Sequence, residues 1–224
     1  MSHLAFTTKS RFRGNTRPKG PETVSQGEAF IYGTESLSSI GYKKIMPEIE
    51  YIDDKMETEE LLASLSDPVR NWFEDTFPDF TEPQKIAIPR IMKGEHLLLC
   101  SPTGSGKTLT AFLSIIDDLV RKSLDGTLPD TVQCIYISPI KALANDIQKN
   151  LIGPLTEIKE RFLPSRAKDI KVGLRTGDTP QKDRQKMLRK PPHILITTPE
   201  SLGLGLASKR FRPILEDLRW MIID

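Results

Sequence analysis

The sequence predicts an α/β protein with a mostly parallel sheet that is covered by helices on both faces. From residue 97 onward, short apolar segments alternate with segments whose apolar residues recur at helical spacing. The short segments are continuously apolar rather than alternating with polar residues, which is typical of parallel strands buried on both faces. The first of them, Leu97 to Cys100, runs directly into a glycine-rich loop followed by a helical pattern. Together these observations favour a doubly wound architecture.

The expected elements follow in order along the chain. After the strand at 97–100 we expect strands at 132–137, 171–174, 194–197 and 220–223, and helices at 109–120, 141–151, 181–188 and 201–206. Upstream, apolar residues at helical spacing from Leu61 to Phe73 predict helices, with Asp67 as a second N-cap and Pro68 at the first helical position. We therefore divide the chain into an N-terminal extension, 1–60, that is partly disordered, and an α/β domain, 61–224. The basic arm at 1–21 is expected to be mobile.

The composition places limits on the function. A hydrophobic content of 38% in 224 residues supports a globular core. A net charge of +2 is too small to indicate nucleic-acid binding by itself. The two cysteines, Cys100 and Cys134, lie in apolar segments and are expected to be reduced and buried. No stretch reaches the ~18 apolar residues of a spanning helix, and the N-terminus is polar and basic, so we expect a cytoplasmic protein.

The glycine-rich loop has the pattern of a phosphate-binding loop. It begins at Ser101, where most such loops have Gly, and ends in Gly-Lys-Thr. Small residues let backbone N–H groups wrap closely around phosphates, Lys107 can reach the β- and γ-phosphates, and Thr108 can ligate Mg²⁺. A flexible linker is the alternative, but a buried strand before the loop and an amphipathic helix after it argue against that. The candidate nucleotide-binding residues here are Ser101, Thr103, Gly104, Ser105, Gly106, Lys107 and Thr108.

Two further residues complete the candidate nucleotide site. Gln84, before the helix that leads into the loop strand, carries an amide that can both donate to and accept from an adenine edge. Asp224 ends the apolar strand Trp220 to Ile223, as does the aspartate that holds Mg²⁺ in phosphate-binding-loop ATPases.

Three strand ends share one arrangement, a hydroxyl residue followed by proline. These pairs are Ser138-Pro139, Thr179-Pro180 and Thr198-Pro199, each an expected helix N-cap at the carboxyl edge of the sheet. Free N–H groups at such ends bind anions, so three of them could hold successive phosphates of one strand, with further cations and hydroxyls nearby. Ordinary helix capping explains each pair equally well. The nearby residues are Lys141, Arg175, Thr176, Gly177 and Asp178.

In this order the motifs resemble those of superfamily 2 helicases, and more closely those of the large-helicase-related (Lhr) family. The resemblance is carried by Phe80 to Gln84, Ser101 to Thr108, Ile137 to Leu143, Arg175 to Thr179 and Ile196 to Leu202, and it covers residues 65–224. It implies a RecA-like ATP-binding domain that uses ATP and Mg²⁺ and binds single-stranded DNA or RNA. It assigns catalysis to Lys107 and Asp224, and the metal to Thr108 and Asp224. The nucleic-acid contacts that it implies are Pro139, Lys141, Arg175, Thr176, Gly177, Thr179, Thr198, Pro199 and Glu200.

The resemblance reaches Asp224, the first residue of a DExH box. A family member continues with Glu, Ile and His and a second RecA-like domain that donates an arginine finger. We therefore expect no ATP hydrolysis by this chain alone, and a second domain or chain as partner. The alternatives are a non-catalytic nucleotide- or nucleic-acid-binding module and one half of a split helicase. A P-loop kinase or GTPase is disfavoured, because the later motifs fit no guanine or nucleoside pocket.

Overall fold

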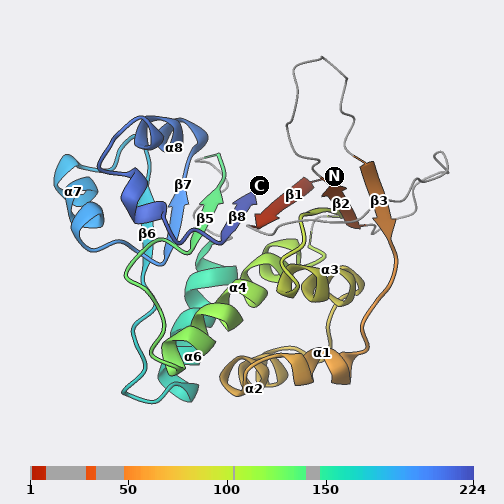
Figure 1. Cartoon of the computed structure of the whole chain (residues 1–224). Helices are drawn as coiled ribbons and strands as arrows, with labels where there is room; N and C mark the ends of the chain where they lie inside the picture. The colour runs from red at the N-terminus through yellow and green to blue at the C-terminus, as the bar shows by residue number, and fades with distance from the viewer. Residues whose placement is uncertain (1, 9–28, 34–47, 103, 140–146) are drawn as a thin grey trace.

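The computed structural model describes residues 2–8, 29–33, 48–102, 104–139 and 147–224. Within these residues an eight-stranded sheet runs across the molecule in the order β3-β2-β4-β1-β8-β5-β7-β6 (Figure 1). Its strands are β1 Ser2–Thr8, β2 Ala29–Gly33, β3 Glu48–Ile52, β4 Leu97–Ser101, β5 Cys134–Ile137, β6 Val172–Arg175, β7 Ile194–Thr197 and β8 Trp220–Ile223.

Helices cover both faces of this sheet. The described helices are α1 Thr58–Ser64, α2 Asp67–Thr76, α3 Glu82–Met92, α4 Lys107–Leu124, the π-helix η2 Gln148–Ile152, α6 Gly153–Phe162, α7 Gln181–Arg189, α8 Pro199–Leu206 and the 3₁₀-helix η3 Arg212–Leu215. Figure 1 shows α7 and α8 beside β6 and β7 at one end of the molecule, with α1 and α2 at the bottom.

The predicted parallel sheet is confirmed in the half that follows β4. β8, β5, β7 and β6 are adjacent and parallel. β1 is antiparallel to both β4 and β8, so β4 and β8 run in the same direction. The carboxyl ends of these five strands therefore lie along one edge of the sheet, which is where ligands bind in open α/β sheets.

Alternate residues of the parallel strand β5 pack into two separate hydrophobic cores. On β5, Cys134 and Tyr136 join the core beneath α2, α3, α4 and α6, where Tyr136 lies 5.1 Å from Phe112 between ring centroids. Ile135 and Ile137 face the other way and pack with Phe211 and residues of α8 and η3. β7 and β8 divide their residues between the two cores in the same way, so the apolar character of these three strands is explained by burial on both sides.

The N-terminal residues contribute more structure than the sequence predicts. Residues 2–8, expected to belong to a mobile arm, form β1 in the middle of the sheet, and that expectation was wrong for them. β2 and β3 extend the sheet beyond β4. Residues 9–28 and 34–47, also in the predicted extension, lie outside the described residues, and the domain boundary at residue 60 stays a prediction.

Two helix boundaries differ from those predicted. The N-cap of α2 is Ser66 rather than Asp67, and the Ser66 amide and hydroxyl donate to the buried Asp117 carboxylate at 2.7 and 2.6 Å. The predicted helix 141–151 lies partly outside the described residues, and its described end does not stop at residue 151. It continues as a π-turn directly before α6, where Pro154 lacks the N–H that a regular α-helix would use.

Two predictions about burial have different outcomes. Cys134 is buried, as expected, and its surroundings raise the pKa of its thiol, whereas Cys100 is only partly buried. Within the described ranges, every helix is too short or too polar to cross a membrane.

Candidate functional site

The glycine-rich loop after β4 adopts a conformation that requires glycine at two positions. Gly104 has φ +82° and Gly106 has φ +84°, both in the left-handed region. A Cβ atom on Gly106 would also lie 2.8 Å from Nε2 of Gln84. The residue that opens α4 is therefore restricted both by its backbone and by its neighbour.

Lys107 is the first residue of α4 and is only 8% exposed. Its Nζ donates to the carbonyl oxygens of Ser101 at 2.6 Å and Pro102 at 2.7 Å, so the ammonium lies inside the curve of the loop. Burial lowers the pKa of Lys107, and the nearby Asp224 carboxylate and Cys100 thiol act in the opposite direction. Among the described residues, the Asp224 carboxylate is the group that favours the charged form of this lysine most strongly.

Asp224 follows β8 and is held by β5. Its N–H donates to the carbonyl of Ile137 at 2.9 Å, and its Oδ2 accepts a 2.5 Å hydrogen bond from the Tyr136 hydroxyl. Thr108, the other predicted metal ligand, is partly buried beside Lys107. Among the described residues, no group of three or more acidic, His or Cys side chains is arranged to hold a metal ion. One carboxylate and one hydroxyl fit Mg²⁺, which usually completes its coordination with phosphates and water.

Gln84 is buried and forms part of a capping box. Its Oε1 accepts from the Thr81 N–H at 2.9 Å, and the Thr81 hydroxyl donates to the Ser105 carbonyl at 3.0 Å. The start of α3 is therefore tied to the glycine-rich loop. Thr81 was not among the predicted site residues, although the spacing Thr-x-x-Gln is a capping-box pattern that could have identified it.

The three predicted strand ends lie in register along one edge. Ile137, Thr197 and Arg175 are aligned across β5, β7 and β6, so the residues that follow them emerge side by side. Neighbouring strands are about 4.8 Å apart, which places the outer two ends about 10 Å from each other. The edge thus presents three strand ends at regular spacing, as the sequence predicts.

The pair Thr198-Pro199 behaves as predicted. The Thr198 side chain caps α8 by accepting from the Ser201 N–H at 3.3 Å, and Pro199 is the first helical residue. Glu200 is exposed in the first turn of α8. Pro139 is exposed after the buried Ser138, but the start of the helix expected to follow it, including Lys141, lies outside the described residues, as does Thr103.

The pair Thr179-Pro180 does not cap a helix, contrary to the prediction. The N-cap of α7 is Pro180, and the Thr179 hydroxyl instead accepts from the Thr176 N–H at 2.8 Å. Arg184 of α7 donates to the carbonyls of Thr179, Thr176 and Gly177 at 2.8, 3.2 and 2.6 Å. The turn 176–179 is therefore closed on itself and bound to α7, because its hydroxyl is used inside the turn.

Arg175 is the most unusual side chain of this edge. It is only 9% exposed, its Nε has no hydrogen-bond partner, and in the described part of the chain it forms no ion pair. Its guanidinium carbon lies 4.5 Å from the centre of the Phe211 ring. Burial, and then the charge of Arg184, lower its pKa. A buried cation without an anion is costly, so this site is suited to receive one.

Phe211 was missed by sequence reasoning. A Cβ on Gly205 of α8 would lie 2.9 Å from Cε1 of Phe211, so the glycine leaves room for the ring beneath Arg175. The contact between Arg175 and Phe211 joins residues 36 positions apart, and no local sequence pattern predicts it.

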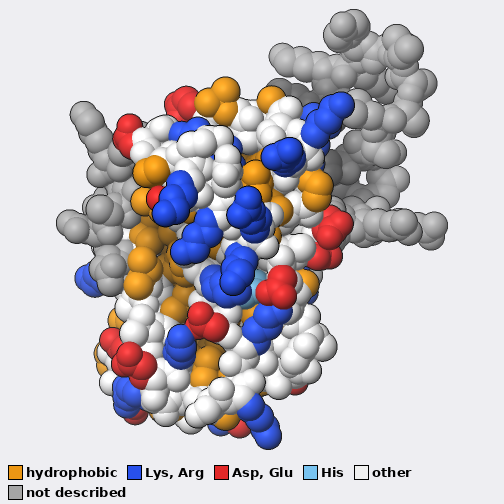
Figure 2. Space-filling model, turned by 90° about the vertical axis from the view of Figure 1, so that its left-hand side faces the viewer, with side chains coloured by type: hydrophobic (Ala, Val, Ile, Leu, Met, Phe, Trp, Pro, Cys, Tyr) orange, Lys and Arg blue, Asp and Glu red, His pale blue; other side chains and the backbone are white. Residues whose placement is uncertain are grey.

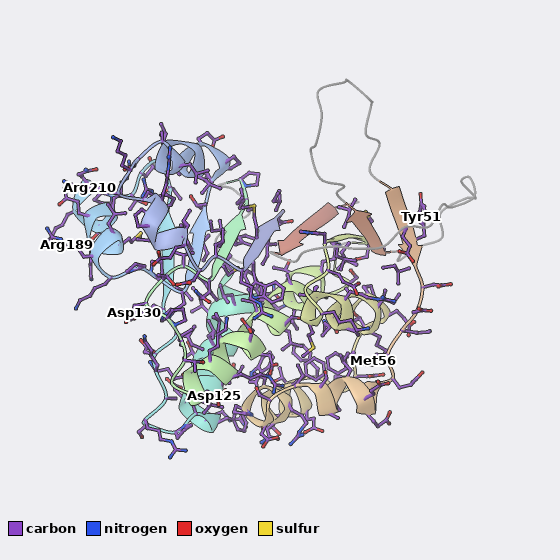
Figure 3. The ribbon with its side chains drawn as sticks, in the orientation of Figure 1. Tyr51, Met56, Asp125, Asp130, Arg189 and Arg210 are labelled. Carbon is purple, nitrogen blue, oxygen red and sulfur yellow. The ribbon has the colours of Figure 1, made fainter. Side chains whose placement is uncertain are left out.

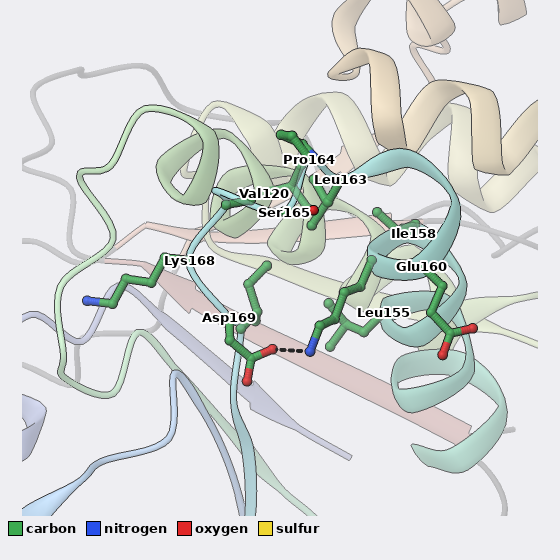
Figure 4. A pocket seen from close by; sticks show the side chains of 12 residues that line it. Val120, Leu155, Ile158, Glu160, Leu163, Pro164, Ser165, Lys168 and Asp169 are labelled. Atoms are coloured by element: carbon green, nitrogen blue, oxygen red, sulfur yellow. Dashed lines mark hydrogen bonds and ion pairs between the residues drawn. The ribbon is translucent and has the colours of Figure 1, made fainter.

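A separate cavity of about 230 Å³ lies away from this edge, between α4, α6 and residues 163–170 (Figure 4). Val120 lines it, about 20 Å along α4 from Lys107 at 1.5 Å per residue. The ion pair between Lys159 and Asp169 lies at its rim, with a 2.5 Å separation. The cavity is not part of the glycine-rich loop. It is also separate from the aligned ends of β5, β7 and β6 at Ile137, Thr197 and Arg175, which we call the strand-end row.

Comparisons with known proteins agree with this geometry. A family model described as DEAD/DEAH box helicase matches residues 81–224. The chain is 49% identical over 168 residues to the ATP-dependent helicase Lhr-Core of Sulfolobus acidocaldarius, which covers 74% of this chain and 19% of that protein. It is 51% identical over 173 residues to the Lhr-Core helicase of Methanothermobacter thermautotrophicus, covering 76% and 20%. The chain spans about a fifth of the length of these curated relatives.

A solved structure gives the same result. The helicase Lhr of Mycobacterium smegmatis, bound to ssDNA and AMP-PNP, superimposes with a TM-score of 0.59 at 42% identity, over 70% of this chain and 20% of that one. The predicted RecA-like fold and the predicted resemblance to Lhr helicases are confirmed.

Proposed function

The chain belongs to the DEAD/DEAH box helicase family, and we propose that it is the first motor domain of an ATP-dependent helicase similar to Lhr. In this role it binds ATP at the glycine-rich loop and a single strand of DNA or RNA at the carboxyl edge of the sheet. A second RecA-like domain, on the same or another polypeptide, supplies the rest of the DExH box and the arginine finger that hydrolysis requires.

One observation carries the proposal more than any other. Lys107 follows β4 through the glycine-rich loop and Asp224 follows β8, and a single strand separates β4 from β8. The Asp224 carboxylate is near enough to Lys107 to oppose the lowering of the lysine pKa by burial. A loop with two left-handed glycines, an inward-pointing lysine and a facing carboxylate is the set of groups that a nucleoside triphosphate with its metal ion needs. No purely structural role requires this combination.

Each part of the nucleotide then has a proposed partner. The loop N–H groups and the start of α4 bind phosphate oxygens, and Lys107 exchanges its two carbonyl contacts for the β- and γ-phosphates. Thr108 and Asp224 would hold Mg²⁺, which when bound neutralises charge on the phosphates. Gln84 is buried against Gly106, and its Nε2 is free of the capping box, which supports its assignment as the adenine reader.

The strand-end row supports the nucleic-acid assignment. Arg175 is a buried cation that forms no ion pair with any described residue, and α8 begins at the end of the neighbouring strand β7. Phosphates spaced along one strand could engage Pro139, Thr198, Pro199 and the turn at Thr176 in succession. Lys141, Thr179, Gly177 and Glu200 remain predicted contacts of the same strand.

Base selection tests the nucleotide assignment. Gln84→Ala should reduce the preference for ATP over GTP in a competition titration with a fluorescent nucleotide, because the amide is the proposed adenine reader. Thr81→Ala serves as the control, since it removes the hydrogen bond from Thr81 to Ser105 but leaves the amide. Equal discrimination by Gln84→Ala and the parent protein would remove Gln84 from the site.

Anion capture tests the nucleic-acid assignment. Arg175→Gln should weaken binding of a labelled single strand and reduce the dependence of log K on log salt by about 0.7, the value for one phosphate contact. Lys93→Gln, at the end of α3, is the matched change of one exposed charge elsewhere. An unchanged salt dependence for Arg175→Gln would contradict the assignment.

A further inference from the structure

The outer face of α7 carries a stripe of four cations. Lys182, Lys186 and Arg189 lie in α7 and Lys190 is its C-cap, and all four are exposed. At 100° per residue the three helical cations fall within an arc of about 60° around the helix axis. Arg184 and Met187 lie on the opposite side, where Arg184 binds the turn 176–179 and Met187 contacts the core. The stripe therefore points away from the protein.

Nothing in the described part of the chain neutralises this stripe. All ion pairs among the described residues lie outside α7. Even Asp183, the acidic residue of this helix, pairs with none of the four cations. On α6, by contrast, the exposed cations Lys159 and Arg161 pair with Asp169 and Asp75.

The arrangement opposes the stability of the helix itself. Lys182 and Lys186 are like charges four residues apart within α7, and such a pair destabilises a helix by about 0.2–0.5 kcal/mol. α7 has no fully buried residue to offset this. A helix that carries four cations on one face at such a cost is suited to an external polyanion.

The stripe continues the proposed nucleic-acid edge. Arg184 donates to three carbonyls of the turn 176–179, so α7 is fixed directly to the end of the strand-end row. Figure 2, which views this side of the molecule, shows Lys and Arg side chains gathered in the middle of the face. Figure 3 shows Arg189 and Arg210 both at this outer end.

We propose that α7 is an additional phosphate-binding surface, on which Lys182, Lys186, Arg189 and Lys190 bind the backbone of the strand after it leaves the turn at Thr176. The proposal rests on the proposed function, because it needs the same strand at the sheet edge. The cations would lengthen the binding site without reading sequence, since backbone contacts fix position and affinity but not base identity.

The test compares two lengths of single strand. Full-length protein and a variant with Lys182→Gln, Lys186→Gln, Arg189→Gln and Lys190→Gln are titrated with labelled oligonucleotides of about 5 and about 20 nucleotides over a range of salt. The control variant carries Lys55→Gln, Arg70→Gln, Lys159→Gln and Arg161→Gln, the same change in net charge at ion-paired positions away from α7. Circular dichroism and nucleotide binding report whether each variant is folded.

The α7 variant should bind the long strand about 10-fold or more weakly, with the slope of log K against log salt reduced by about 2–3. Its binding of the short strand and of nucleotide should match the parent, and the control should bind both strands like the parent. Equal long-strand affinity and slope in the α7 variant and the parent, or an equal loss in the control, would overturn the proposal and leave the proposed function intact. If the parent binds neither strand, the proposed function fails and this proposal with it.

Discussion

At the scale of single residues, burial sets the protonation state of a histidine. His193, just before β7, is fully buried, and its Nδ1 accepts from the Lys171 N–H at 2.9 Å. Burial, and then the charges of Lys171 and Lys168, lower its pKa to about 4. The ring is therefore a neutral structural group at pH 7, at the end of the strand opposite the proposed site.

This histidine should make stability depend on pH. The unfolded chain binds a proton at its ordinary pKa near 6.5 and the folded chain at about 4, so stability is lost as pH falls through this window, by about 3 kcal/mol in total. Urea unfolding from pH 7 to 4 should show a steeper loss for the parent than for His193→Asn, which keeps an acceptor. Parallel curves for the two proteins would show that His193 does not titrate in this way.

At the scale of elements, the segment between α8 and η3 brings Phe211 against Arg175. Phe211 fills the space left by Gly205 and lies under the guanidinium at 4.5 Å. The attraction between a cation and an aromatic ring is worth about 0.5–2 kcal/mol, and it also fixes the orientation of the guanidinium. We infer that Phe211 is a positioning residue for a phosphate contact.

A double-mutant cycle tests that role. Phe211→Leu should weaken single-strand binding several-fold in the parent protein but have no further effect in the Arg175→Gln background, because the ring acts through the guanidinium. Phe211→Tyr keeps the aromatic face and should restore binding. If Phe211→Leu weakens binding equally in both backgrounds, its role is only to support the core.

Elements differ in how far the sequence predicts them. The strands from β4 onward are correctly predicted, because β4, β5, β7 and β8 are almost entirely apolar segments between turn residues. β7 and β8 match the predicted bounds residue for residue. β1 is missed because its partners are residues 97–101 and 220–223, far away in the sequence, and the chain around it is basic and polar. Thr179 is mispredicted because two local uses compete for one hydroxyl.

The residues of the candidate site also differ in how far the sequence predicts them. The local sequence predicts Lys107, Thr108 and Asp224. A phosphate-binding loop and a carboxylate at the end of a strand can each be recognised from a few consecutive residues. Tyr136 and Phe211, which hold Asp224 and Arg175, depend on which side chains meet in the folded sheet. Contacts of that kind have no period or spacing by which a single sequence could reveal them.

At the scale of the whole molecule, β1 joins two halves of the sheet. It lies between the loop strand β4 and the Asp224 strand β8, and it is hydrogen-bonded to both. Ala5 is paired with Leu98 on one side and Ile223 on the other. The distance between the two halves of the nucleotide site is therefore set by this strand.

A proline in β1 should separate those halves. Ala5→Pro removes an N–H from a central strand and should lower the free energy of unfolding by about 3 kcal/mol, with weaker nucleotide binding. Ala5→Ser keeps the N–H and is the control, expected to stay within about 1 kcal/mol of the parent. Denaturant unfolding and nucleotide titration would measure both effects. Identical results for the two variants would mean that β1 does not hold the site together.

The central claim is that the glycine-rich loop binds the phosphates of ATP through Lys107. Titration of a fluorescent ATP analogue into the parent protein and into Lys107→Ala tests it most directly, with Lys122→Ala in the last turn of the same helix as the matched control. Loss of a charge-assisted contact to phosphate should weaken binding by about 10-fold or more in Lys107→Ala and leave Lys122→Ala like the parent. Equal affinity of Lys107→Ala and the parent for the analogue would contradict the account.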